Sequence, residues 1–211
     1  MARPIDWDAL AKMSALLAVL PEAARRSSRL VEIGKGETLF ERGHAPRWMH
    51  CVIAGEVRLL RRSRDGGEIV LQRARAGFIA EASLDQNSYH CDAIAATASA
   101  VLLIQRKTFI EALDEPAFRN HWIGHLAFEL RKVRAQSERL SMHTARERII
   151  HFIETEGDDG VVTLTESKKN WAVGMGLTHE AVYRALAEMR RSGQLMIDGL
   201  RLQLVQHSAR R

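Results

Sequence analysis

The sequence predicts an α+β protein in three parts: an N-terminal β-barrel or β-sandwich, a long helix, and a C-terminal winged helix-turn-helix. Three observations lead to this fold. Short strand-like runs separated by turn residues fill residues 30–104, a helical pattern with a seven-residue period occupies 116–142, and a helix-turn-helix pattern followed by a hairpin lies in 165–204. We therefore expect one domain at 1–115 and a second at 143–211, joined by the helix 116–142.

The composition indicates a folded, soluble protein. Hydrophobic residues make up 46% of the 211 residues, which is enough for a substantial core. No run approaches the roughly 18 apolar residues of a membrane helix, and the N-terminal segment carries Asp6, Asp8 and Lys12, unlike a signal peptide. We expect a cytoplasmic protein without a membrane partner.

Positive charge is concentrated in the last quarter of the chain. Residues 161–211 carry eight Lys/Arg against four Asp/Glu, a net charge of +4, whereas the first 160 residues carry 23 against 22. A basic module joined to a neutral one fits polyanion binding, because phosphate neutralisation supplies most non-specific DNA affinity. A solvated basic face is the alternative explanation of the charge taken alone.

The N-terminal part begins with a helical pattern and continues as strands. Residues 7–20 have the apolar spacing of an amphipathic helix that Pro21 ends. The clearest hairpin joins 56–62 to 68–72 through the turn 65–67, where glycine supplies the positive φ that tight turns demand. Because the strands are short and closely spaced, they indicate a barrel or sandwich.

The helix 116–142 carries a heptad seam. Its apolar positions recur in alternating steps of three and four, and its other faces are charged. The seam consists of Ile123, Leu126, Leu130, Val133, Ser137 and Leu140. Such a stripe favours a partner helix and so a homodimer, although a single helix lying on its own domain is the alternative.

A helix at about 144–156 leads into the helix-turn-helix and its wing. Ala172 lets two helices approach closely, Gly176 makes the turn with Leu177 anchored in the core, and Thr178 caps the second helix. Three residues are expected to bury that helix: Val182, Leu186 and Met189. A hairpin follows, with Asp198-Gly199 at its tip.

Burial of one face of the second helix turns other side chains outward, namely His179, Glu180, Tyr183 and Arg184. Glutamate accepts from cytosine N4 and arginine clasps guanine O6 and N7, so Glu180 and Arg184 are suited to reading neighbouring base pairs. An i,i+4 salt bridge between them is the alternative. We expect phosphate contacts from the surrounding polar and basic residues: Thr165, Ser167, Lys168, Lys169, Thr178, Arg190 and Arg201.

Four motifs and the order of parts resemble the bacterial CRP/FNR family, named after the cyclic-AMP receptor protein and the fumarate-nitrate reduction regulator. The motifs are Gly34-Lys35-Gly36-Glu37-Thr38-Leu39-Phe40, Ala54-Gly55-Glu56-Val57-Arg58-Leu59, Phe78-Ile79-Ala80-Glu81 and Thr178-His179-Glu180-Ala181-Val182-Tyr183-Arg184. The resemblance covers nearly the whole chain. It implies a β-roll of the cyclic nucleotide-binding jelly-roll type, with a dimerisation helix and a winged helix-turn-helix.

The resemblance also implies a function. Family members are homodimeric transcription regulators that bind double-stranded DNA at inverted-repeat operators and contact RNA polymerase. Their recognition helix reads Arg-Glu-Thr-Val-x-Arg, so Glu180 and Arg184 occupy the base-contacting positions and His179 replaces the first arginine. No enzyme is expected, because the sequence lacks a phosphate loop and the Gly-x-Ser-x-Gly and His-Glu-x-x-His motifs.

The phosphate-binding cassette of the family's cyclic-nucleotide members is altered here. Ala80 replaces its glycine, Ala82 its leucine, and Tyr89-His90 stands where Arg-Ser belongs. No Lys or Arg occurs between Ala76 and Gln105, so a buried phosphate would lack a cationic partner from this segment. This argues against cyclic AMP as the effector. The effector pocket is still expected around Glu81, Ala82, Ser83, Tyr89 and His90.

The two cysteines, Cys51 and Cys91, exclude an iron-sulfur cluster bound by four cysteines. Each follows a histidine, His50 or His90, and strand alternation places His50 and Cys51 on opposite faces. The cysteines suit a Cu(I) site or a disulfide, and either histidine suits haem ligation, whereas a core-filling thiol is the alternative. A second function therefore stays open: a thiol, metal or haem sensor whose winged helix contacts protein rather than DNA.

Overall fold

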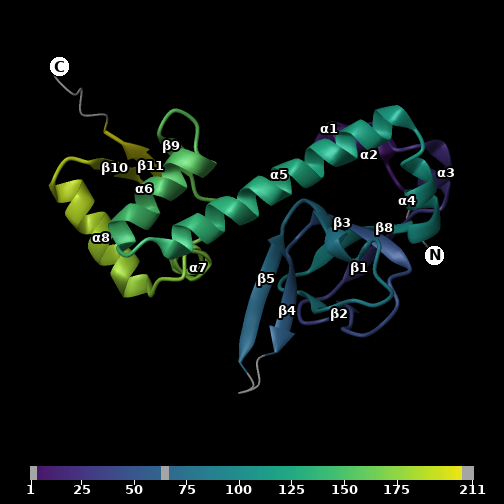
Figure 1. Cartoon of the computed structure of the whole chain (residues 1–211), viewed down its shortest axis with the longest axis horizontal. Helices are drawn as coiled ribbons and strands as arrows, with labels where there is room; N and C mark the ends of the chain where they lie inside the picture. Colours follow the sequence, from purple (N-terminus) through teal and green to yellow (C-terminus); the bar gives the residue numbers. More distant parts are fainter. Residues whose placement is uncertain (1–3, 63–66, 206–211) are drawn as a thin grey trace. The chain divides into compact units, whose positions relative to one another are not determined.

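The computed structural model describes residues 4–62 and 67–205 (Figure 1). The chain divides into two compact units, Met1–His125 and Leu126–Arg211. The division falls inside the long helix and not at its ends. Among the described residues, no helix combines the length and apolar character that a membrane span requires.

Three short helices open the first unit: α1 (Trp7–Met13), α2 (Ala15–Ala18) and α3 (Glu22–Arg26). The single helix expected over 7–20 is wrong, because Ser14 has extended backbone with φ −148° and ψ 124°. The interruption lets the chain bend while its leucines still reach the core. Leu10, Leu16, Leu17 and Leu20 are all buried there.

The β-roll consists of two four-stranded antiparallel sheets. The first has the order β1 (Arg29–Ile33), β8 (Ser99–Gln105), β3 (Trp48–Ala54), β6 (Gly77–Ile79). The second has the order β2 (Thr38–Phe40), β7 (Asp92–Ala95), β4 (Val57–Arg62), β5 (Glu68–Ala74). The hairpin predicted from the sequence is confirmed as the β4–β5 pair, and Asp65 and Gly66 of its expected turn lie outside the described residues.

Residues of both sheets form the inner core of the roll. This cluster includes Val52, Val57, Leu59, Ile79, Val101 and Leu103. A second cluster lies on the other face of the first sheet, where Met49, Cys51 and Leu102 pack with the N-terminal helices. The strand alternation expected for β3 is therefore confirmed, since Cys51 and Val52 belong to different clusters.

The long helix α5 (Pro116–Ser141) follows the short helix α4 (Arg106–Ala112) and ends one residue before the predicted limit. Its first turns bury Phe118 and Trp122 against Phe78 and Phe109 of the first unit. The seam residues are exposed, with Val133 at 61% and Ile123 at 56% relative exposure. Within the described residues, these apolar side chains are therefore left exposed to solvent.

The second unit contains a three-helix core and a small sheet. The helices are α6 (Ala145–Glu156), α7 (Lys168–Gly174) and α8 (His179–Arg191). The sheet has the order β10 (Leu195–Asp198), β11 (Arg201–Leu204), β9 (Val161–Thr163). The wing expected from the sequence is confirmed as β10–β11, and the structure adds β9, whose three residues are too few to show a strand period.

Candidate nucleic-acid interface and sensor site

Two helix caps and a turn glycine define the helix-turn-helix of the second unit. Ser167 and Thr178 are the N-caps of α7 and α8, and the Thr178 hydroxyl accepts a hydrogen bond from the Ala181 backbone N–H at 3.2 Å. Gly176 makes the turn with φ +65°. A Cβ at Gly176 would lie 2.7 Å from Leu140 Cδ2, so the end of that exposed leucine side chain would have to shift, and the left-handed backbone would be strained.

One face of α8 is buried and the opposite face is exposed, as the sequence predicts. The buried face consists of Val182, Ala185, Leu186 and Met189. The exposed face consists of His179, Glu180, Tyr183 and Arg184. The rings of His179 and Tyr183 lie 6.0 Å apart, and Glu180 and Arg184 form no ion pair with each other. Their charged ends are therefore available to a ligand.

The residues expected to contact phosphates lie on three elements of the same unit. Ser167, Lys168 and Lys169 begin α7, Arg190 is in the last turn of α8, and Arg201 begins β11. Thr165 precedes α7 and is exposed. The hydroxyls of Ser167 and Thr178 already accept hydrogen bonds as helix caps, so both serve the fold whatever they bind.

Arg148 is a positioning residue that the sequence analysis missed. Its guanidinium donates to the carbonyl oxygens of Leu140 and Met142, at the end of α5, and to those of Met175 and Gly176, in the turn. An isolated arginine in an amphipathic helix has no sequence pattern that marks such a role. These hydrogen bonds join the end of α5 to the turn that precedes α8.

In the first unit, the segment expected to bind the effector forms a single 3-10 turn, η1 (Glu81–Ser83). Ala80 precedes it in the left-handed conformation, with φ +67°. Glu81 Oε1 lies 2.9 Å from His125 Nε2, and its other oxygen accepts a hydrogen bond from Gln72. Burial raises the pKa of Glu81, but hydrogen bonds from His125 and Gln72 and the charge of His125 outweigh this, so the net shift is downward.

The five residues expected to line the effector pocket differ in burial and in their contacts. Ala82 is exposed and Ser83 is buried with its hydroxyl unpartnered among the described residues. Tyr89 stacks on Phe40 at a centroid distance of 3.8 Å, and its hydroxyl donates to the Trp48 carbonyl oxygen at 3.4 Å. Of the five, Tyr89 alone lines the cavity beside β2 and β3.

A cyclic nucleotide does not fit the cassette as it stands. The segment 76–105 contains no Lys or Arg, and the residue in place of the family's arginine is Tyr89, engaged with Trp48. Two arginines from outside the segment contact its backbone. Arg61 of β4 donates to the His90 carbonyl oxygen at 3.3 Å, and Arg106 donates to the Leu84 carbonyl oxygen at 2.7 Å. The cassette itself therefore provides no side-chain cation for a buried phosphate.

The expectation that Cys51 and Cys91 form a thiol pair is not supported. Both are free and buried, Cys51 in the cluster under the N-terminal helices and Cys91 in the inner core of the roll. Burial raises the pKa of Cys51 to about 12. Within 4–62 and 67–205, no three or more His, Cys, Asp or Glu side chains form a group that could hold a metal ion. The structure favours the alternative, a core-filling thiol, for Cys51.

The two histidines named as metal or haem ligands have different surroundings. His50 is 3% exposed, and burial lowers its pKa to about 4. Its Nδ1 has no hydrogen-bond partner among the described residues. His90 is only partly buried. The His50 ring lies 5.0 Å from the Phe40 ring and 6.1 Å from the Tyr89 ring.

Comparison with known proteins finds a family model that matches part of the first unit, and solved structures that share the fold over most of the chain. Residues 30–115 match the cyclic nucleotide-binding domain family. No curated protein sequence matches the chain at a significant level. A protein from Silicibacter pomeroyi DSS-3, assigned as a cAMP-binding regulatory protein, is 26% identical, with 95% of this chain and 94% of that chain covered and a TM-score of 0.57.

Two further solved structures share the fold across most of the chain. A CRP-family transcriptional regulator from Thermus thermophilus is 24% identical, with 83% of this chain and 92% of that chain covered and a TM-score of 0.54. FixK2 from Bradyrhizobium japonicum is 24% identical, with 85% and 93% covered and a TM-score of 0.61. The roll, the long helix and the C-terminal unit therefore all occur together in known structures.

Proposed function

Because this chain carries a cyclic nucleotide-binding domain at 30–115 and has the fold of CRP-family transcription regulators, we propose that it is a homodimeric, sequence-specific DNA-binding transcription regulator. Such a regulator acts in the cytoplasm, binds an inverted-repeat operator and contacts RNA polymerase. It is not an enzyme.

The observation that carries the proposal is the exposed face of α8. Glu180 and Arg184 stand one turn apart on a helix whose opposite face is buried, and they are not paired with each other. A carboxylate and a guanidinium at this spacing match the donor and acceptor groups of adjacent base pairs in the major groove. The Thr178 cap and the Gly176 turn fix the start of α8. A helix that reads base pairs requires such a fixed orientation.

Dimerisation follows from the exposed seam of α5. Five apolar side chains of the seam are at least 40% exposed: Ile123, Leu126, Leu130, Val133 and Leu140. Their three-and-four spacing over three heptads matches a two-helix seam, and burying them would be favourable. Two copies of α5 would present two recognition helices, and these suit half-sites about one helical turn apart.

The signal that controls this regulator is not cyclic AMP. The cassette lacks the cation that a cyclic phosphate needs, and Glu81 is already paired with His125. We expect another molecule to bind the roll and to shift the balance between two arrangements of the dimer.

The test is selection of oligonucleotides from a random library by the purified full chain, followed by binding measurements on the selected site. We expect an inverted repeat. Arg184→Ala should cost roughly 1–3 kcal/mol and relax preference at one base pair in each half-site, whereas Lys168→Ala should weaken all sequences alike. Arg26 is an exposed arginine of α3, and Arg26→Ala is the control. It should change neither the affinity for DNA nor the base preference.

Two outcomes would overturn the proposal. One is that selection enriches no sequence. The other is that Arg184→Ala and Lys168→Ala lose equal affinity for selected and random DNA, which would indicate an electrostatic surface without base reading. In that case a winged helix that contacts protein becomes the better hypothesis.

A further inference from the structure

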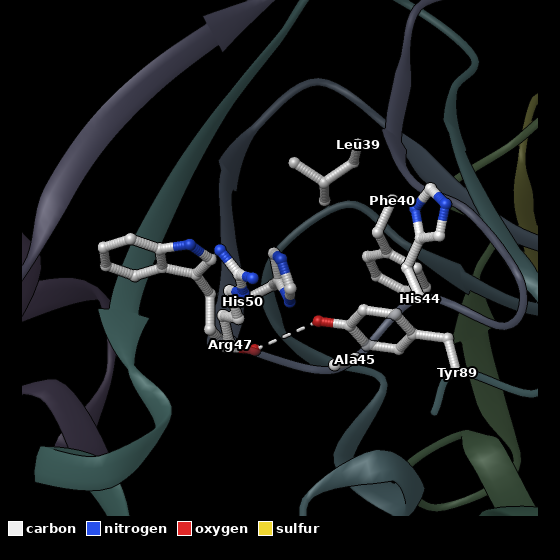
Figure 2. A pocket seen from close by; sticks show the side chains of 8 residues that line it. Leu39, Phe40, His44, Ala45, Arg47, His50 and Tyr89 are labelled. Atoms are coloured by element: carbon white, nitrogen blue, oxygen red, sulfur yellow. Dashed lines mark hydrogen bonds between the residues drawn. The ribbon is translucent and has the colours of Figure 1, made fainter. Parts of the chain in front are cut away.

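A cavity of about 390 Å³ lies between β2, the loop that leads to β3, and Tyr89 (Figure 2). This volume is within the range of small-molecule sites in proteins. Of the five residues expected around the effector, the cavity includes Tyr89 but not Glu81, Ala82, Ser83 or His90, so it is centred away from the turn η1.

Aromatic rings form the walls of this cavity. Phe40 and Tyr89 are stacked nearly parallel, with an interplanar angle of 15°, as Figure 2 shows, and Trp48 also lines the cavity. The Trp48 ring is covered by the Arg29 guanidinium at 4.4 Å, and its carbonyl oxygen accepts the Tyr89 hydroxyl. Because these rings are fixed by contacts within the protein, the walls are preformed for a flat apolar ligand.

A buried polar group faces the same cavity. His50 lines it, is 3% exposed, and lies 5.0 Å from the Phe40 ring centre. Burial lowers the pKa of His50 to about 4, so the imidazole is neutral at pH 7. Its Nδ1 has no partner among the described residues, which is costly for a buried polar atom. A polar atom of a ligand would satisfy it.

The charge of the residues that line the cavity favours an anionic ligand. Arg47 lines the cavity and is exposed, and its guanidinium makes no hydrogen bond or ion pair within the described residues. No Asp or Glu is among the lining residues. The neighbouring acid, Glu41, lies 3.6 Å from His44 on the exposed side. Arginine binds carboxylates with two parallel hydrogen bonds, so a carboxylate is the fitting group.

We propose that this cavity binds a small aromatic carboxylate, with its ring against the aromatic side chains that line the cavity, its carboxylate on Arg47 and a polar atom within reach of His50. The site is a property of the first unit alone. It therefore stands whether or not the chain binds DNA.

Isothermal titration calorimetry of the full chain without DNA tests the proposal, with 2-naphthoate as the probe. Two matched probes separate its parts: 2-naphthamide keeps the ring without the charge, and cyclohexanecarboxylate keeps the charge without the aromatic ring. We expect 2-naphthoate to bind and each matched probe to bind at least about tenfold more weakly. No binding at millimolar concentration, or equal binding of all three, would overturn the proposal.

Two exposed arginines give a matched pair of variants. Arg47→Gln should weaken 2-naphthoate about tenfold and leave 2-naphthamide unchanged, because it removes only the charge-assisted contact. Arg42→Gln, next to the cavity but not lining it, should change neither. Wild-type affinity in Arg47→Gln would place any bound anion elsewhere and would also overturn the proposal. Since both side chains are exposed, circular dichroism should show unchanged folding.

The His50 contact has its own readout. Addition of 2-naphthoate should shift the imidazole signals of His50 in a ¹⁵N-labelled sample, with His50→Phe assigning them by their loss. Unchanged His50 signals at saturating probe would mean that the ligand does not enter the cavity.

Discussion

The guanidinium of Arg148 on α6 donates a hydrogen bond to the carbonyl oxygen of Met175, in the turn of the helix-turn-helix, at 3.0 Å. The same side chain donates to Met142 at 2.9 Å and to Leu140 at 3.2 Å, just beyond and within the last turn of α5. Carbonyl groups at helix ends lack partners within the helix, so one arginine here satisfies groups from two helices. The Arg148 side chain therefore links the end of α5 to the turn between α7 and α8.

Arg148→Ala should therefore lower the free energy of unfolding by about 2–3 kcal/mol, because several carbonyl groups lose a charged donor at once. The measurement is urea denaturation followed by circular dichroism. Arg146→Ala is the matched control on the same helix, since Arg146 makes one exposed hydrogen bond, to Gln194. Equal losses of unfolding free energy in Arg148→Ala and Arg146→Ala would show that the Arg148 hydrogen bonds add no stability.

Thr178→Ala should destabilise the second unit by about 1 kcal/mol, because the cap of α8 loses its side-chain acceptor. Thr178→Ser retains a hydroxyl and should recover most of the loss. Thermal unfolding monitored by circular dichroism measures both. If serine and alanine behave alike, the hydroxyl does not act as a cap.

Leu130→Glu tests the proposed α5 dimer and should leave the protein monomeric. Leu130 is 50% exposed in the single chain, so the change costs the monomer little, but it would bury two carboxylates in the dimer seam. The dimer dissociation constant should rise about 100-fold. Analytical ultracentrifugation measures it, with Arg131→Glu as a control that places the same charge off the seam. A dimer that survives Leu130→Glu would show that α5 does not form the interface.

The stability contributed by Glu81 should depend on pH. The pKa of Glu81 is lower in the folded protein than its usual value of 4.5, so the folded state binds fewer protons. The contribution is complete above about pH 4.5 and is lost as the pH falls through the folded pKa. Urea denaturation of wild type and Glu81→Gln over this range measures it.

The difference between these two proteins should shrink on acidification, because only the wild type has a carboxylate to protonate. His125 and Gln72 face the carboxylate, and the Cys51 thiol is close enough to feel its charge. A constant difference from pH 7 to pH 3.5 would contradict the pairing of Glu81 with His125.

The Cys51 thiol should be unreactive in the folded protein. With a pKa of about 12, only about one Cys51 in 100,000 is a thiolate at pH 7, and the side chain is 1% exposed. We expect slow reaction with a disulfide reagent in the native state and rapid reaction in guanidinium chloride. If the native protein is labelled rapidly and Cys51→Ser is not, the hypothesis that Cys51 is a sensing thiol would be supported.

Much of the second unit was predictable because its signals are local. Thr178, Gly176 and the buried face of α8 each obey rules that act within a few residues, and the structure confirms all three. The heptad spacing gave α5 to within one residue for the same reason. Periodicity and caps need no knowledge of the tertiary fold.

The features that the sequence analysis missed depend on residues far apart in the chain. The cavity joins Phe40 and Trp48 to Tyr89, and the Arg148 contacts span 27 residues to Met175. The break at Ser14 is set by the packing of leucines, which have the same periodicity in one helix or two. The expected thiol pair of Cys51 and Cys91 is not supported, because the two side chains lie in different core clusters. The presence of two cysteines in a sequence does not show that they face each other.

The central position of β11 affects how the protein is made. This strand lies between β10 and β9, and its Leu202 is fully buried in the core that also contains α8. A premature stop codon before Leu202 would thus leave the recognition helix without its support, rather than merely trimming a wing. On the ribosome, the C-terminal unit cannot complete its core until that leucine has left the exit tunnel, whereas the β-roll is by then free to fold.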